Sequence, residues 1–208
     1  MKIMNTMRGA HQWSIRVGVA AAILCATAPA SSWVLSLGAG PKELFLGVGA
    51  ATVASANGTV NLVSASVTAA NVGSGTAVPM DSNSTQGASP FDGYAVCNPT
   101  TQVYVGGSYR QPDAVTGSAV ATLQVSTPAN LTSGSDSIPF SQIVWSSTAN
   151  GNTFADIPAS AFNGSTQTLA TFGRNTYVEN CFVFSYLNQL TVPAGTFTGR
   201  ATFTLATP

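Results

Sequence analysis

The sequence has very few of the residues that enzymes use to move protons. Its single histidine, His11, lies in the N-terminal segment that an export signal would remove, so the exported chain would contain none. Charged residues make up only 7% of the whole chain. Nucleophilic catalysis needs a base beside the attacking hydroxyl, and after export Lys42 would be the only lysine. We therefore expect a protein that packs, binds or assembles, and we predict no enzyme activity, no cofactor and no metal site.

Residues 1–30 have the pattern of a secretory signal peptide. Three basic residues precede an apolar core at residues 17–24, and Ala-Pro-Ala at residues 28–30 offers a small-residue cleavage site. An uncleaved anchor is the alternative, because residues 17–41 carry no charge and a bilayer span needs roughly 20 apolar residues. Proline and serine interrupt that stretch, which favours cleavage. We expect a protein that is secreted or held at the cell surface, with no stable membrane insertion.

Removal of the signal would leave a slightly acidic chain. Four basic and seven acidic residues would remain, which is a net charge of −3. Nucleic-acid binding needs clustered lysine and arginine to displace counterions, and a polybasic membrane patch needs the same residues. Nucleic acid is therefore excluded as an expected partner.

Two cysteines, Cys97 and Cys181, would remain after export, because Cys25 lies within the signal. An even number in an oxidising compartment predicts one disulfide. Its loop of about 85 residues would contribute roughly 4–5 kcal/mol in the chain-entropy model. Two separate buried thiols are the alternative. A two-thiol metal site is less favoured, since histidine and CxxC spacing are both missing.

Short alternating segments dominate the rest of the chain. We predict a leader or first strand at residues 31–56 and one domain at residues 57–208. Strands separated by glycine and proline, with no apolar helical stripe, favour an all-β antiparallel sandwich, and a closed barrel is the alternative. Residues 71–93 are predicted as a long loop. The predicted strands are residues 59–70, 94–97, 102–109, 118–126, 138–146, 167–172, 176–187 and 196–206.

Aromatic residues at alternating positions of the later strands predict the core of the sandwich. The four side chains that we expect there are Phe182, Phe184, Phe197 and Phe203.

The end of the chain resembles a known family. Residues 192–204 read Val-Pro-Ala-Gly-Thr-Phe-Thr-Gly-Arg-Ala-Thr-Phe-Thr, and Gly195 is fourteenth from the end. This segment resembles the closing strand of the spore coat U and Csu-type secreted pilins of the chaperone–usher class. Phe197 stands where those pilins usually have tyrosine, and Thr207 replaces their penultimate aromatic residue. Residues 137–145 are similar to another segment of the same family.

The resemblance implies an immunoglobulin-like sandwich that lacks one strand. A segment of the neighbouring subunit would fill the groove, with backbone hydrogen bonds for affinity and alternate side chains in pockets. It implies a bacterial pilin-like or coat-like subunit that passes through the periplasm and supports adhesion or biofilm. Identical or related subunits and an export chaperone would be its partners.

One segment has the apolar alternation that such a donor strand needs. Its alternating residues are Leu44, Leu46, Val48 and Ala50. A shorter run of Trp33, Leu35 and Leu37 precedes it. The same segment could instead fold back as the first strand of its own domain, and both alternatives stay open.

Aromatic residues suggest a second hypothesis, a monomeric secreted sandwich that binds carbohydrate or another surface ligand. A sugar platform could be formed from Tyr104, Tyr109, Trp145, Tyr177 and Tyr186. Aromatic residues at strand spacing are, however, more often packed in a sheet.

Acidic residues indicate little chemistry. Asp81 and Asp92 have the spacing of the first and last ligands of a calcium loop, but Gln86 occupies the position that needs glycine. A carboxylate pair for glycoside hydrolysis would have to come from scattered positions, namely Asp113, Asp136, Asp156 and Glu179.

Overall fold

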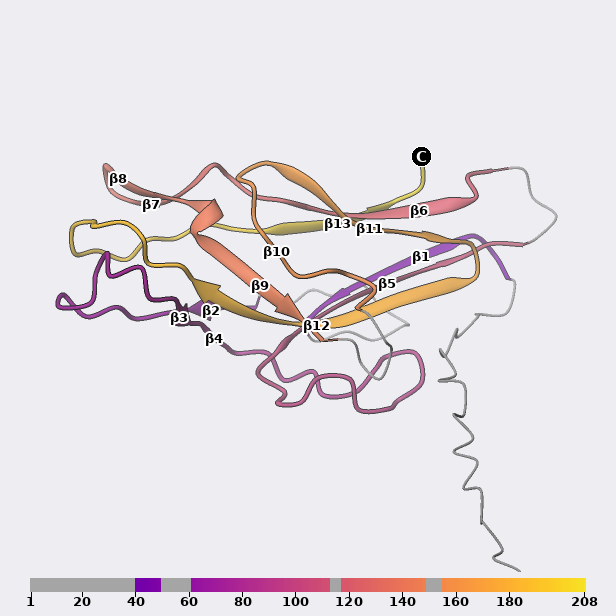
Figure 1. The fold of residues 1–208 in the computed structure, drawn as a ribbon. Coiled ribbons are helices and arrows are strands. Elements are labelled where there is room, and N and C mark those ends of the chain that lie inside the picture. The colour runs from indigo at the N-terminus through magenta and orange to yellow at the C-terminus, as the bar shows by residue number, and fades with distance from the viewer. Residues whose placement is uncertain (1–39, 50–60, 113–116, 149–154) are drawn as a thin grey trace, which may run out of the picture. The chain divides into compact units, whose positions relative to one another are not determined.

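The computed structural model describes most of the chain after the predicted signal peptide (Figure 1). The described ranges are residues 40–49, 61–112, 117–148 and 155–208. The chain divides after Ser31, and every described strand belongs to the unit Ser32–Pro208. The predicted signal at residues 1–30, the apolar run at 33–37, Ala50 and Asp113 lie outside the described residues.

The larger sheet is antiparallel and has β12 near its centre. In spatial order its strands are β1 (Glu43–Val48), β5 (Val103–Arg110), β12 (Thr176–Tyr186), β9 (Ile143–Ser147) and β10 (Ser160–Ala161). The short strand β3 (Val78–Pro79) also pairs with β12, beyond the end of β5.

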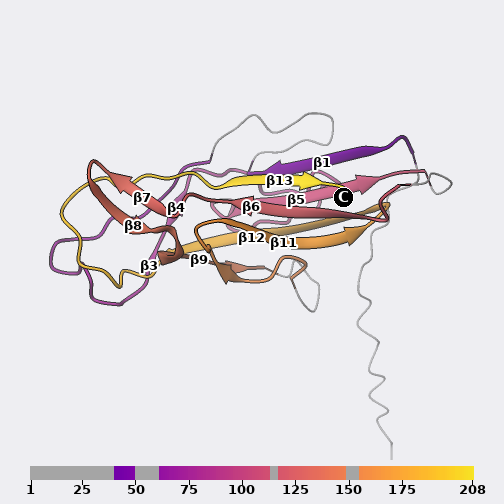
Figure 2. The ribbon, with the colours of Figure 1, turned by 90° about the horizontal axis from the view of Figure 1, so that it is seen from above.

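A smaller antiparallel sheet lies against the first (Figures 1 and 2). Its strands are β11 (Thr166–Gly173), β6 (Val120–Ser126) and β13 (Thr202–Ala206), with β6 in the middle. Two small ladders complete the described strands: β2 (Val63–Ser64) with β4 (Asp81–Ser82), and β7 (Asn130–Ser133) with β8 (Asp136–Pro139).

The predicted all-β sandwich is confirmed. The only helical element in the described ranges is one 3-10 turn, η1 (Phe140–Gln142), and no helix there is long and apolar enough to cross a bilayer. Alternation is the reason for the fold, because Val120–Ser126 buries every second residue, Ala121, Leu123 and Val125, at 0% exposure. A strand that hides one face must pack that face on a second sheet.

The core fills the space between the two sheets. Phe182 and Phe184 are buried in it, whereas Phe203 is half-buried and packs on its margin. Phe197 is half-buried and does not belong to the core cluster.

Aromatic contacts close one side of this core. Phe162 meets Phe140, Trp145 and Phe184 at ring distances of 5.1, 4.9 and 6.0 Å. Ile157, on the segment that leads to β10, is fully buried beside them.

The predicted disulfide joins Cys97 to Cys181, with a Cα–Cα distance of 5.5 Å and a sequence separation of 84. Cys181 lies on β12, on the face turned away from the core, and Cys97 ends a loop that crosses this face. With Val96 and Tyr104 the two cysteines form a second, smaller buried cluster.

Several predicted strands differ from the observed ones. Within residues 61–70, the described part of the predicted strand 59–70, only Val63–Ser64 is paired. Residues 94–97 contribute one isolated bridge, Ala88–Ala95. The strand predicted at 138–146 is broken at Phe140 by η1, and β13 begins only at Thr202.

Candidate functional site

Strand β1 forms one edge of the larger sheet and is the candidate functional site. It pairs with β5, and no other described strand pairs with it. The N–H of Gly49 donates to the carbonyl of Tyr104 at 2.7 Å, whereas the carbonyl of Val48 accepts from Asn61 Nδ2 at 3.1 Å. Alternate residues of a strand point to opposite sides, so the backbone groups of Leu44 and Leu46 point away from β5. Such an edge is a template for another chain.

The core-facing side chains of β1 are poorly covered. Leu44 is 37% exposed, and Leu46 and Val48 are half-buried against the core. Their cross-strand neighbours on β5 include Tyr109 and Val105, both at 0%. The core-facing side chains are therefore much more exposed on β1 than on the adjacent strand β5, because the smaller sheet ends at β13.

A glycine lets β13 approach this part of the larger sheet. A Cβ at Gly107, the neighbour of Leu46, would lie only 3.1 Å from Leu205 Cδ2. Figure 2 shows β13 running beside β1 and β5, and Phe203 and Leu205 are both half-buried at this margin. The seam between β1 and β13 is therefore apolar and partly open to solvent.

Two polar contacts lie at one end of this seam, where β1 begins and β13 ends. Arg110 Nη2 lies 2.9 Å from Glu43 Oε2, across the first pair of the β1–β5 ladder. Lys42 Nζ donates to Thr207 Oγ1 at 3.3 Å. Both contacts are exposed, so each contributes little to stability and neither prevents β1 from leaving its place.

On the outer face of β1, β5 and β12, the cross-strand neighbours lie in rows. Phe45, Ser108 and Tyr177 are cross-strand neighbours, and Gly47, Gly106 and Glu179 form the next row. A Cβ at Gly106 would overlap the hydroxyl of Tyr104. The ring of Tyr104 therefore lies over the glycine row, where only residues without side chains leave it room.

Glu179 is the centre of a polar cluster on this outer face. Its Oε2 accepts hydrogen bonds from Ser89 Oγ at 2.8 Å and from Tyr104 OH at 3.0 Å. Burial raises the pKa of Glu179, the carboxylates of Asp92 and Asp156 raise it further, and the two hydrogen bonds act in the opposite direction. Burial also raises the pKa of Tyr104, and the charge of Glu179 adds to this effect.

A loop that was predicted to have no pattern covers the cluster. Phe91 stacks on Tyr177 with ring centres 4.3 Å apart and meets the edge of Phe45 at 5.5 Å. Tyr177 OH donates to Asp92 Oδ2 at 3.3 Å, and burial raises the pKa of Tyr177. Sequence reasoning missed Ser89 and Phe91, and it considered Asp92 only as a calcium-loop ligand. The one available signal was an aromatic residue, Phe91, within a stretch otherwise typical of a loop.

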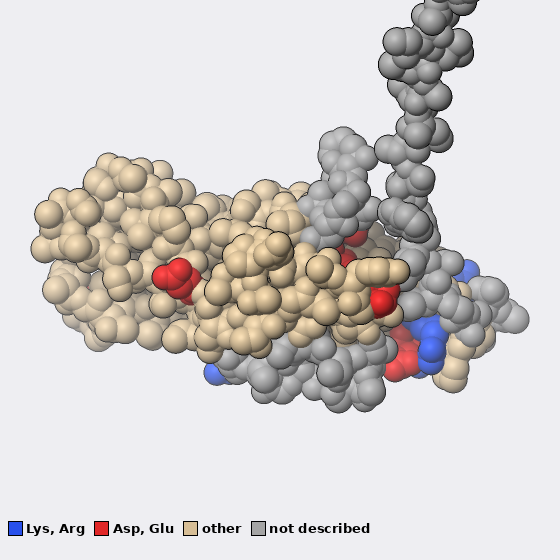
Figure 3. Space-filling model, turned by 90° about the horizontal axis from the view of Figure 1, so that it is seen from below, with Lys and Arg blue, Asp and Glu red and all other residues tan. Residues whose placement is uncertain are grey.

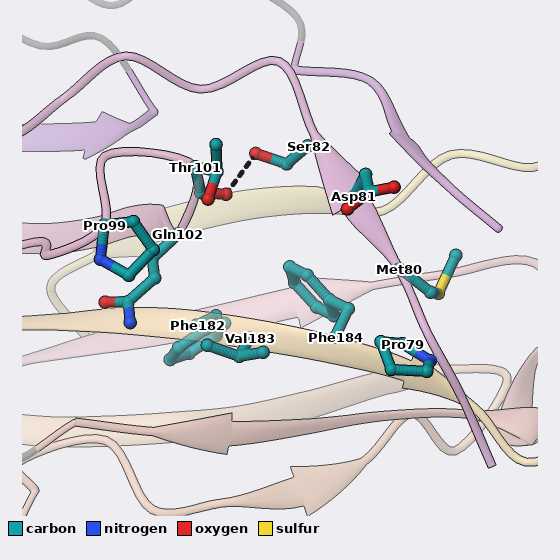
Figure 4. A pocket seen from close by; sticks show the side chains of 10 residues that line it. All are labelled: Pro79, Met80, Asp81, Ser82, Pro99, Thr101, Gln102, Phe182, Val183 and Phe184. Carbon is teal, nitrogen blue, oxygen red and sulfur yellow. Dashed lines mark hydrogen bonds between the residues drawn. The ribbon is translucent and has the colours of Figure 1, made fainter.

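A separate hollow of about 270 Å³ opens where β12 changes its neighbour (Figure 4). β12 pairs with β5 as far as Cys181, and its pairing with β3 begins at Ser185. Phe182 and Val183 line the gap between these two partners. Ser82 Oγ donates to the carbonyl of Thr101 across it at 2.6 Å. The hollow is smaller than the roughly 300–1,000 Å³ of most ligand pockets, so it is a weaker candidate than the β1 edge.

Three of the acidic residues considered in the sequence lie near one another, because the carboxylates of Asp92 and Asp156 both raise the pKa of Glu179. Asp81 pairs with Ser64 in a short ladder, and Asp92 lies over Tyr177. No group of three or more His, Cys, Asp or Glu that could hold a metal ion occurs in the part of the chain described. Figure 3 shows the charged groups sparsely distributed on the face that it presents.

The aromatic residues considered as a sugar platform are mostly packed inside. Tyr104 and Tyr109 are fully buried, Trp145 is 3% exposed and donates through Nε1 to the carbonyl of Pro158 at 3.0 Å. Tyr186 is also buried, and Tyr177 is half-covered by Phe91. These five side chains do not form one exposed surface.

The predicted donor residues Leu44, Leu46 and Val48 lie in β1 of their own sheet. Comparisons with known proteins add no relative: no family model, no curated protein and no solved structure matches the chain. The geometry of β1 and the sequence itself are therefore the basis on which function is inferred.

Proposed function

We propose that this protein is a secreted structural subunit of a pilin-like or coat-like assembly at the bacterial cell surface. Copies of it, or related subunits, would join by exchange of β1, so that β1 of one copy occupies the edge of β5 in the next. The sandwich would then be immunoglobulin-like with one strand supplied in trans. Adhesion or biofilm formation is the role that such an assembly would serve.

The exposure of the core-facing side of β1 is the observation that carries this proposal. Leu44 is 37% exposed although its neighbour Tyr109 is fully buried. An edge strand held on one side only, with one exposed ion pair and one exposed hydrogen bond at its end, can be replaced by an identical strand at little cost, since every contact is made again in the exchanged form.

Export is supported by two features. The disulfide between Cys97 and Cys181 is typical of proteins that mature in an oxidising compartment. The segment at residues 1–30 has signal-peptide character. The resemblance of residues 192–204 to Csu-type secreted pilins agrees with both, and it adds an export chaperone as an expected partner.

A disulfide trap across β1 and β5 tests the exchange. Glu43 and Arg110 are paired in register and partly exposed, and directly paired strand residues have Cα atoms about 5.5 Å apart or less, within the range that a disulfide spans. In Glu43→Cys/Arg110→Cys, an exchanged β1 would form an interchain disulfide. A β1 that remains in its own sheet would form an intrachain disulfide.

The variant would be expressed in its native cell and the cell-surface protein run on non-reducing denaturing gels. A ladder of linked chains that collapses on reduction is the expected result. Each single-cysteine variant is the matched control for random cross-linking. A monomer whose engineered disulfide is wholly intrachain would overturn the proposal.

A further inference from the structure

The outer face of β1 has only one large apolar side chain, Phe45, which is 5% exposed. The outward positions on either side of it are Glu43, which forms only the exposed ion pair with Arg110, and Gly47. The inner face is the half-open seam with β13. The side chain that covers Phe45 therefore contributes much of the packing that keeps β1 in its own sheet.

Phe91, at the tip of the loop of residues 84–97, is the side chain that covers it. Its ring meets the edge of Phe45 and stacks on Tyr177, two strands away. Ser108 is the residue of β5 that lies between them in the same row. Because serine is small, Phe91 reaches from β1 to β12 across β5.

The loop is itself fastened to the sheet at several points. Ser89 and Asp92 bind Glu179 and Tyr177 on β12, and the disulfide from Cys97 holds its end on the same strand. Within the loop, the N–H of Ser89 donates to the carbonyl of Tyr94 at 2.8 Å. All of these anchors are on β12 or in the loop, so they remain when β1 leaves.

We propose that the loop of residues 84–97 is a clamp that retains β1 in its own sheet through the Phe45–Phe91 contact. The clamp is fixed to β12 and grips β1, so it sets how readily β1 can detach from β5. Where β1 is exchanged between copies, which rests on the function proposed above, the clamp would hold the subunit as a monomer until the contact opens. The same contact would then close on the incoming β1.

Hydrogen exchange of single backbone amides tests the clamp on the purified monomer. The amides of Phe45 and Gly47 point towards β5 by the register of the ladder. In Phe91→Ala their exchange should accelerate at least about tenfold, because a buried aromatic contact is lost. The amides of β6 and of the β12–β9 ladder should change much less.

Tyr94→Ala is the matched control, because Tyr94 is in the same loop but is 76% exposed. It should leave exchange in β1 unchanged. Phe91→Leu, which keeps apolar bulk, should give an intermediate rate and covers the case in which Phe91→Ala does not fold. Unchanged exchange in β1, or an equal acceleration in every strand, would overturn the clamp.

The disulfide trap separates this inference from the proposed function. In Glu43→Cys/Arg110→Cys carrying Phe91→Ala, the interchain fraction should rise if both proposals hold. Faster exchange of the β1 amides without any interchain disulfide would support the clamp and reject assembly through β1. A rise in interchain disulfide without faster exchange would reject the clamp alone.

Discussion

Tyr104 donates a hydrogen bond of 3.0 Å to Glu179 by lying across Gly106. Tyr104 and Glu179 are not directly paired, since Tyr104 faces Cys181 and Glu179 faces Gly106 in the β5–β12 ladder. The diagonal contact exists because the residue between them has no side chain. This relationship ties the outer face of the sheet to the loop that grips β1.

Replacing Gly106 by alanine should displace Tyr104. The new methyl group would overlap the Tyr104 hydroxyl and lie 3.1 Å from Glu179 Cβ, and overpacking of this kind costs about 1–3 kcal/mol. Urea unfolding followed by fluorescence measures the loss. Gly173→Ala is the control, because nothing lies within 4 Å of the added atom; an equal loss in both variants would contradict the prediction.

Glu179 should make stability fall as the pH rises. Burial raises its pKa above the ordinary value of 4.5, so the folded protein holds this proton more tightly than the unfolded chain does. The contribution to stability is complete below the unfolded pKa, is lost as the pH rises to the folded pKa, and is constant above it.

Glu179→Gln cannot ionise and should remove that slope. The stability of the variant relative to the natural protein should therefore increase with pH across this window and then level off. Thermal unfolding over the acidic and neutral range measures it. Asp156→Asn serves as a comparison, because burial also raises the pKa of Asp156. A pH slope that survives in Glu179→Gln would contradict the assignment.

Phe184 and Phe197 should differ sharply although the sequence predicts both as core. Phe184 is buried and contacts Phe162 and Phe182 at 6.0 Å, so Phe184→Ala should cost about 3–5 kcal/mol. Phe197 is only half-buried and outside the core cluster, so Phe197→Ala should cost on the order of 1 kcal/mol. Equal costs in denaturant unfolding would show that the core extends to the 197 turn.

Loss of the disulfide should destabilise the domain and loosen the clamp. Cys97→Ala/Cys181→Ala removes a link with a separation of 84 residues, which is worth about 4–5 kcal/mol in the chain-entropy model. Calorimetry measures the loss in stability, and amide exchange should show β1 more affected than β6. A variant as stable as the natural protein would contradict the prediction.

Much of the fold could be predicted because it follows from local periodicity. The alternation of residues 118–126 and 176–187 indicated strands that the structure contains as β6 and β12. The positions of Cys97 and Cys181 indicated their disulfide. In each case the signal lies in neighbouring residues or in a simple count.

The candidate site could be predicted only in part. The sequence indicated that Leu44, Leu46 and Val48 form a strand, but it left open whether that strand stays in its own domain. It indicated residues 71–93 as a featureless loop, although Phe91 within it contacts Phe45, 46 positions earlier in the chain. Local patterns carry no information on such contacts.

By itself, then, the sequence determined the strand content, the apolar face of each strand and the one disulfide, because these depend on residue type and spacing. The tertiary structure alone decided that Phe45, Ser108 and Tyr177 form one row, that Gly106 makes room for Tyr104, and that β13 stops short of covering Leu44. The physical reason is that register and sheet width arise from pairing between segments far apart in the chain. A shift of one residue in either ladder would move the side chains of the shifted strand to the opposite face and break these contacts.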